Sequence, residues 1–151
     1  MLKSKVKILG TGAYLPGEPV KRDQLSHVLG EIKDAPVTIL NWAERMDSVM
    51  KEMLEIEQYY FAIDPETREF TETNITMAVK AAKKALEDAR LDPDDIDLLL
   101  FGCASMEQMP PASTRIQEEL GIKHCGEMSI QSNCTSVYKS IMLAHDLISL
   151  G

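Results

Sequence analysis

The stretch that decides the fold is GEMSIQSNCTSVYKSIMLAHDLISLG, residues 126–151. Its first part, 126–132, is typical of a short strand, and residues 135–151 carry apolar side chains at the spacing of an amphipathic helix. Cys134 therefore lies at a junction between a strand and a helix, among small polar residues. A thiol at such a junction is either a reactive group or a small buried core residue.

Upstream of this stretch, helices and strands alternate. A helix is predicted from about Thr73, and the continuous apolar run 96–105 predicts a strand covered on both faces. A second helix is predicted from 111 or 112 to 120, with Gly121 as its C-cap. We therefore predict a layered α/β fold with a mainly parallel sheet. Because the chain stops directly after a helix, we expect this fold to be truncated at its C-terminus.

The N-terminal part gives weaker patterns. Its Gly10-Thr11-Gly12 turn indicates close backbone packing, because the rest of a phosphate-binding GxGxxG pattern is missing. The stretch 5–16 predicts a strand followed by this turn. The other predicted elements are a short amphipathic helix within 21–34, an amphipathic helix over 38–56 and a hairpin-like segment over 58–70.

Composition excludes several functions. The chain has 24 acidic and 16 basic residues and a net charge of -8, which disfavours nucleic acids and anionic membranes as partners. No apolar run is long enough to span a bilayer, and no signal peptide is apparent, so a cytoplasmic location is expected. Three cysteines without CxxC spacing predict neither a disulfide framework nor a metal site.

Cys134 is the candidate nucleophile. The free amides and the dipole at a helix N-terminus stabilise a thiolate and can hold an oxyanion. A sharp turn from strand to helix also exposes a nucleophile, provided that its neighbours are small. Cys103, inside an apolar strand, and Cys125, in a turn before a strand, are predicted to be structural.

A thiolate nucleophile usually works with a base, and this chain offers no evident one. His145 lies on the same predicted helix as Cys134 but roughly 16 Å further along its axis. We expect His145 to be an exposed or hydrogen-bonded helix residue. His27 and His124 belong to no pattern that connects them with Cys134.

Four segments, in this order, resemble the first half of β-ketoacyl-acyl carrier protein synthase III and its relatives in the thiolase superfamily. Together they cover about two thirds of the chain. They are ILGTGAYLP (8–16), AVKAAKKALEDARLDPDDIDLLLFGCAS (78–105), PASTRIQEELGI (111–122) and MSIQSNCTSVYKSIMLAHDLISLG (128–151).

The resemblance implies a thiolase-like fold of two similar halves, usually dimeric, of which residues 1–151 would be an incomplete N-terminal half. Cys134 matches the residue that takes an acyl group from a coenzyme A thioester, which is a substrate and not a bound cofactor. The acyl group is then condensed with malonyl-acyl carrier protein, and carbon dioxide is released. The family's catalytic histidine and asparagine belong to the second half, so this chain alone is expected to be inactive.

The resemblance also implies three substrate-binding residues. Met109 lies in the loop that reaches into a neighbouring subunit's acyl pocket, and Glu107 in the same loop matches a glutamate used for acid–base chemistry. Trp42 is a candidate for stacking on the adenine of coenzyme A. The alternatives are a solvated loop carboxylate for Glu107 and a core position in an amphipathic helix for Trp42. Residues 50–61 lack the arginine-rich character expected of the coenzyme A segment.

Three functions remain open from the sequence. The first is an acyltransferase half of a condensing enzyme, a homodimer or a hetero-oligomer with a C-terminal half or a homologue. The alternative is a non-catalytic thiolase-like subunit that binds or orients an active partner. The third is a cysteine hydrolase of thioesters, which the distance from Cys134 to His145 disfavours.

Overall fold

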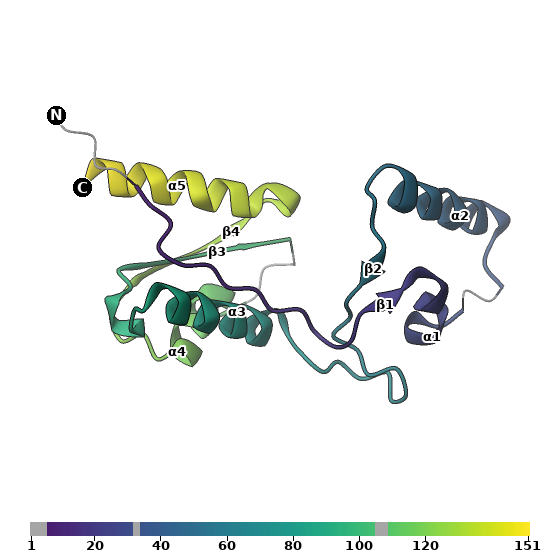
Figure 1. The fold of residues 1–151 in the computed structure, drawn as a ribbon, viewed down its shortest axis with the longest axis horizontal. Helices are drawn as coiled ribbons and strands as arrows, with labels where there is room; N and C mark the ends of the chain where they lie inside the picture. The colour runs from purple at the N-terminus through teal and green to yellow at the C-terminus, as the bar shows by residue number, and fades with distance from the viewer. Residues whose placement is uncertain (1–5, 32–33, 105–108) are drawn as a thin grey trace. The chain divides into compact units, whose positions relative to one another are not determined.

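The computed structural model describes residues 6–31, 34–104 and 109–151, and the chain forms two compact units (Figure 1). The first unit combines the N-terminal segment up to Tyr14 with Asn74–Gly151, and the second is Leu15–Thr73. The candidate nucleophile belongs to the first unit. No helix among the described residues combines the length and the apolar character needed to cross a bilayer.

The centre of the first unit is a parallel pair of strands, β3 (Leu98–Cys103) and β4 (Gly126–Gln131). Their register pairs Leu98 with Gly126 at one end and Cys103 with Gln131 at the other. Both strands lie within the predicted ranges, and their parallel direction confirms the predicted α/β arrangement.

Helices cover both faces of this pair (Figure 1). The helix α5 (Ser136–Leu150) packs on one face, and α4 (Ala112–Leu120) packs on the other together with α3 (Asn74–Ala89). The apolar face of α3 and that of α4 meet in the core, against Leu99 and Phe101 of β3. The buried members of this core are Ile75, Val79, Ile116, Leu120 and Ile122.

The ends of α4 follow the predicted signals. Pro111 is its N-cap, a position where the missing N–H of proline does no harm. Gly121 ends the helix in the left-handed conformation with φ 75°, which a residue without a Cβ adopts at little cost.

The strand predicted before the Gly10-Thr11-Gly12 turn is wrong for its described residues, because none of residues 6–16 forms a strand. Backbone groups here bond to side chains of α3 instead of a neighbouring strand. The N–H of Thr11 donates to the Asp88 carboxylate at 2.9 Å, and Lys84 Nζ donates to the carbonyl of Ala13 at 3.0 Å. The interpretation of Gly10 and Gly12 as sites of close packing is confirmed, because a Cβ on either would collide with the α3 backbone.

The second unit contains short strands and two helices. The antiparallel strands β1 (Val20–Lys21) and β2 (Gln58–Tyr59) pair with each other. Within the predicted 21–34 helix, the structure has only a 3₁₀ turn over Arg22–Gln24 and α1 (Leu25–Leu29), which Gly30 ends at φ 85°. Residues 32–33 lie outside the described residues.

The hairpin-like segment is confirmed by an antiparallel bridge between Ile63 and Phe70. Its turn is held by the Asp64 carboxylate, which accepts the backbone N–H groups of Glu66 at 2.9 Å and Thr67 at 2.8 Å. These bonds stabilise the charged form and lower the pKa of Asp64.

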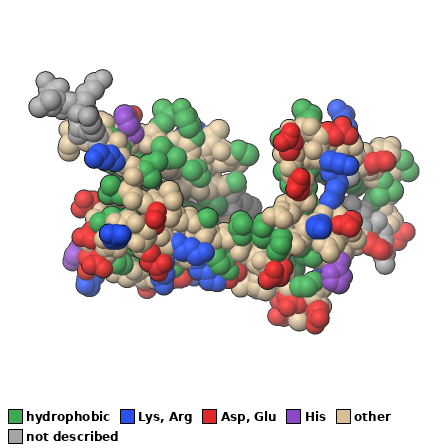
Figure 2. Space-filling view, in the orientation of Figure 1, with side chains coloured by type: hydrophobic (Ala, Val, Ile, Leu, Met, Phe, Trp, Pro, Cys, Tyr) green, Lys and Arg blue, Asp and Glu red, His purple; other side chains and the backbone are tan. Residues whose placement is uncertain are grey.

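The helix predicted over 38–56 is α2 (Val37–Glu52). Its apolar side chains are largely exposed, so the expectation of a core position for Trp42 is wrong: Trp42 is 61% exposed. The physical reason is that no other described element packs extensively against α2. In the first unit, apolar side chains are also exposed along α5, where Figure 2 shows them gathered.

Candidate functional site

Cys134 lies where the chain turns from β4 into α5. The strand ends at Gln131, a 3₁₀ turn covers Asn133–Thr135, and α5 begins at Ser136. The side chain of Cys134 is exposed, so the alternative of a buried core cysteine is wrong. The thiol is therefore at the carboxyl end of a parallel strand, the edge at which α/β folds place their reactive groups.

The turn around Cys134 has a strained residue at its start. Asn133 has φ 48°, in the left-handed region, which asparagine adopts more readily than most residues with a Cβ. Around it, the Thr135 hydroxyl donates to the carbonyl of Ser132 at 2.8 Å, and Lys139 Nζ donates to the Ser132 hydroxyl. The predicted sharp turn with small polar neighbours is confirmed.

Ser136 connects this turn to the neighbouring strand. Its hydroxyl accepts the N–H of Ser132 at 2.9 Å and lies 2.9 Å from the carbonyl oxygen of Cys103, at the end of β3. The carbonyl oxygen of Asn133 is also within hydrogen-bond distance, at 2.7 Å. The sequence indicated only that Ser136 is small, because the bond to Cys103 depends on strand pairing.

The other two thiols have different surroundings. Cys103 ends β3, is partly buried and has the side-chain amide nitrogen of Asn74 4.0 Å from its sulfur. Cys125 precedes β4 and packs against the core. Burial raises the pKa of the Cys125 thiol, and the Glu127 carboxylate raises it further, against a backbone hydrogen bond at Leu99 that lowers it. The thiolate form of Cys125 is therefore disfavoured at neutral pH.

None of the three histidines belongs to the 132–135 turn that carries Cys134. His145 is on α5, exposed, with Nδ1 3.1 Å from the carboxylate of Asp146. His124 precedes β4, whose opposite end leads to Cys134, and His27 belongs to α1 in the second unit. The expectation of an exposed or hydrogen-bonded helix residue is confirmed for His145.

The predicted substrate-binding residues are not assembled with Cys134 by any described contact. Met109, between β3 and α4, is 87% exposed, and its peptide bond to Pro110 is cis. Glu107 lies outside the described residues, and Trp42 lies on α2 in the second unit. Their roles stay predictions.

A polar cluster that the sequence did not reveal holds the start of α4 against β4. Ser113 is fully buried, and its hydroxyl donates to the Glu127 carboxylate and lies 2.8 Å from the hydroxyl of Ser129. Glu127 and Ser129 are two residues apart on one strand, so their side chains share a face. The sequence shows this two-residue spacing of Glu127 and Ser129. It does not show that the packing of α4 brings the buried Ser113 against them.

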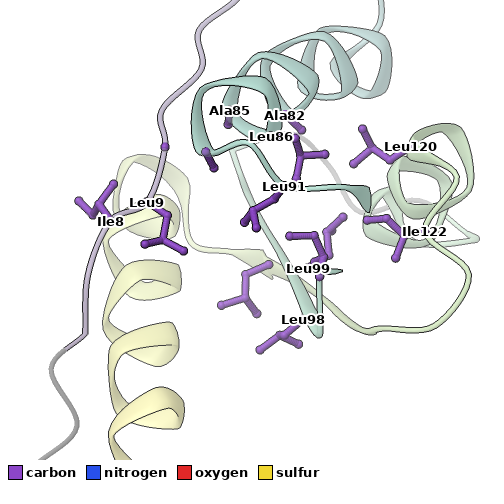
Figure 3. A pocket seen from close by; sticks show the side chains of 14 residues that line it. Ile8, Leu9, Ala82, Ala85, Leu86, Leu91, Leu98, Leu99, Leu120 and Ile122 are labelled. Atoms are coloured by element: carbon purple, nitrogen blue, oxygen red, sulfur yellow. The ribbon is translucent and has the colours of Figure 1, made fainter. Parts of the chain in front are cut away.

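An apolar cavity of about 390 Å³ lies elsewhere in the first unit (Figure 3). Ile8 and Leu9 line it from the N-terminal segment, together with residues of α3 and the first half of β3. Its lining side chains are aliphatic, so it offers no nucleophile or acid–base group. Because Cys134 follows the far end of the parallel pair, the cavity is not part of the candidate catalytic centre.

The comparison with known families matches residues 3–110 to "Beta-ketoacyl synthase, N-terminal domain". The chain belongs to the β-ketoacyl synthase family. The matched residues include the N-terminal segment, α3 and β3. Cys134 follows the matched range.

Two curated relatives of this β-ketoacyl synthase chain extend the likeness through Cys134. Both are named β-ketoacyl-[acyl-carrier-protein] synthase III. The protein from Methylococcus capsulatus is 28% identical over 146 residues, and the one from Rickettsia prowazekii is 27% identical over 146 residues. Each alignment covers 96% of this chain, but only 39% and 40% of the respective relative. The chain thus spans about two fifths of their length.

Solved structures confirm the thiolase-like fold of this β-ketoacyl synthase chain. The tetronic acid condensing enzyme AbyA1 superposes with a TM-score of 0.77 at 24% identity, covering 97% of this chain and 42% of AbyA1. The synthase III from Aquifex aeolicus superposes with a TM-score of 0.71 at 23% identity, covering 95% of this chain and 40% of the enzyme. At these identities the likeness concerns the fold alone.

Proposed function

We propose that this chain provides the acyl-accepting half of a condensing enzyme of the synthase III type, with Cys134 as the nucleophile. The Cys134 thiolate attacks the carbonyl carbon of an acyl-coenzyme A thioester. The bond to the coenzyme A sulfur breaks, coenzyme A leaves as its thiolate and takes up a proton, and the acyl group stays on Cys134.

One observation carries the proposal: an exposed thiol stands at the carboxyl end of β4, in the turn to α5, in a chain of the β-ketoacyl synthase family. Free amides at the start of a helix such as α5 can hold the oxyanion of the tetrahedral intermediate. Burial disfavours the thiolate of Cys125, which leaves Cys134 as the better nucleophile of the two.

The second half of the reaction needs groups beyond this chain's described site. Loss of carbon dioxide from malonyl-acyl carrier protein generates an enolate, which attacks the acyl carbonyl and releases the Cys134 thiolate. The histidine and asparagine that assist this step in the family lie in its second half. We therefore infer that the acting enzyme is a homodimer or hetero-oligomer that includes such a half.

Three residues are proposed to contact substrates. Trp42, whose indole is 61% exposed, would stack on the adenine of coenzyme A. Met109, 87% exposed after β3, would contribute a flexible apolar side chain to a neighbouring subunit's acyl pocket. Glu107 would act in acid–base chemistry on the substrate.

The test is to incubate the chain with acyl-coenzyme A, alone and with a C-terminal partner half. Intact-mass measurement and peptide mapping then locate the acyl group. We expect one acyl adduct, on Cys134, and none in a folded Cys134→Ala variant. An adduct absent from the complex, or carried by Cys103 or Cys125 instead, would overturn the proposal.

A second candidate is a non-catalytic subunit that orients an active homologue. It is favoured by the segment 50–61, MKEMLEIEQYYF, which contains no arginine with which to hold the phosphates of coenzyme A. This candidate predicts tight association with an intact synthase, no acyl adduct on Cys134, and unchanged behaviour of the complex when Cys134 is replaced by alanine.

A further inference from the structure

Ser136 is the first residue of α5, two residues after Cys134, and is only 1% exposed. A hydroxyl so far removed from water needs partners within the protein. It accepts the N–H of Ser132 at 2.9 Å, and its own proton can go to the carbonyl oxygen of Cys103 at 2.9 Å or of Asn133 at 2.7 Å. One hydroxyl therefore links the end of β3 to the turn that carries Cys134.

Gly102 brings the same two parts of the chain together by a different contact. A Cβ built on Gly102 would lie 2.9 Å from the carbonyl carbon of Ser136 and 2.9 Å from the nitrogen of Val137. Such distances are too short for any side chain, so the start of α5 rests directly on the β3 backbone. A hydrogen-bond contact and a packing contact thus fix one point of α5 against one strand end.

Ser140 provides an internal comparison on the same helix. It is also buried, at 8% exposure, and its hydroxyl donates to the carbonyl oxygen of Ser136 at 2.9 Å. That bond stays within α5 and leaves the turn untouched. Of these two hydroxyls, that of Ser136 is the one that bonds both to the turn and to β3.

We propose that Ser136 is a positioning residue for Cys134: its hydroxyl holds the 132–135 turn, and with it the backbone of Cys134, at the end of β3. The proposal rests on the proposed function, in which Cys134 is the nucleophile. It adds the residue that maintains the geometry of the thiol without touching the substrate.

Removal of this hydroxyl has a defined consequence. In Ser136→Ala, the N–H of Ser132 and the carbonyl of Cys103 lose their buried partner, which is costly. The turn then moves toward water to satisfy them. Asn133 then loses support for its left-handed conformation, and the orientation of the Cys134 side chain changes with the turn.

The experiment measures the rate of Cys134 alkylation by iodoacetamide across pH, followed by peptide mass mapping, in the full chain without acyl-coenzyme A. The alkylation rate of Cys134 in Ser136→Ala is expected to differ about tenfold from that of the wild-type chain at neutral pH, because the turn no longer holds the thiol in one orientation. Ser140→Ala, the matched control, should keep the wild-type profile, and Ser136→Thr, which retains the hydroxyl, should restore most of it.

A folded Ser136→Ala chain with the wild-type profile would overturn the proposal, as would an equal shift in Ser140→Ala. If Ser136→Ala does not fold, amide exchange in the wild-type chain decides: the Ser132 N–H must exchange far more slowly than an unprotected amide. Because no acyl donor is used, the result is independent of whether Cys134 accepts an acyl group. Failure of acylation with a normal Ser136 effect would overturn only the proposed function.

Discussion

Asp94 and Lys123 join two turns at the amino end of the parallel strands. Lys123 Nζ lies 2.8 Å from the Asp94 carboxylate, and both side chains are exposed. Hydrogen bonding by Lys123 lowers the pKa of Asp94 from its ordinary 3.8, and the same bond with Asp94 raises the pKa of Lys123 from its ordinary 10.5. The charged forms of both groups are therefore favoured by folding.

The directions of these two pKa shifts define the pH range in which the pair stabilises the fold. The contribution of Asp94 is complete above its unfolded pKa and is lost as pH falls through its lowered folded value. The contribution of Lys123 is complete below its unfolded pKa and is lost as pH rises through its raised folded value. We expect Asp94→Asn to lower the Tm slightly at pH 7 and low salt, with the difference vanishing in 1 M salt because the pair is exposed. A salt-independent difference in scanning calorimetry would contradict this.

At the residue scale, the sequence predicted that Cys134 lies between a strand and a helix, but not which groups hold that turn. The junction can be located from the sequence, because apolar residues recur with a period of two in a strand and of about 3.6 in a helix. The bond from Ser136 to Cys103 joins residues 33 positions apart, so it depends on the pairing of β3 with β4, which local sequence patterns do not predict. The contact of Ser113 with Glu127 could not be predicted either, because it depends on how α4 packs against β4.

At the element scale, helices were predicted well and the first strand was not. The helices α3, α4 and α5 begin and end within a few residues of their predicted bounds, since their apolar spacing and caps are local signals. A strand also needs a partner edge. The sequence of residues 6–16 begins with a strand-like pattern, but backbone groups of Thr11 and Ala13 bond to side chains of α3. The local sequence pattern does not predict these partners.

The contact between the N-terminal segment and α3 gives the next prediction. A Cβ on Gly12 would lie 2.1 Å from the carbonyl oxygen of Ala81, a backbone atom that cannot move without displacing α3. We expect Gly12→Ala to lower the free energy of unfolding by about 1–3 kcal/mol, as overpacking typically does. Urea denaturation followed by circular dichroism measures the change.

Gly126→Ala is the matched control for this variant. Its Cβ would lie 3.2 Å from Cδ1 of Leu98, the end of a flexible side chain, and so is easier to accommodate. We therefore expect Gly126→Ala to lower the free energy of unfolding by less than Gly12→Ala does. Equal losses in the two variants would mean that the segment does not rest on α3 as described.

At the scale of the whole molecule, the positions of the histidines bear on the proposed condensation. The sequence contains three histidines, and none is next to Cys134 in the chain. His145 follows Cys134 by eleven residues, on α5. His124 precedes β4, and His27 belongs to the second unit. Acyl transfer to a thiolate needs little more than the thiolate and an oxyanion site. Decarboxylative condensation also needs stabilisation of an enolate, for which no group beside Cys134 is evident among the described residues.

The two half-reactions should therefore separate in this chain. After acylation of Cys134, addition of malonyl-acyl carrier protein is expected to release no carbon dioxide beyond that of the Cys134→Ala variant, whereas a full-length synthase III releases it under the same conditions. Isotopically labelled malonyl carbon allows the gas to be counted directly. The physical reason is that an acyl-cysteine is only an electrophile, and the nucleophile must be generated by groups that stabilise negative charge on the malonyl fragment. Carbon dioxide released by the chain alone, and abolished by Cys134→Ala, would show that such groups lie within these 151 residues.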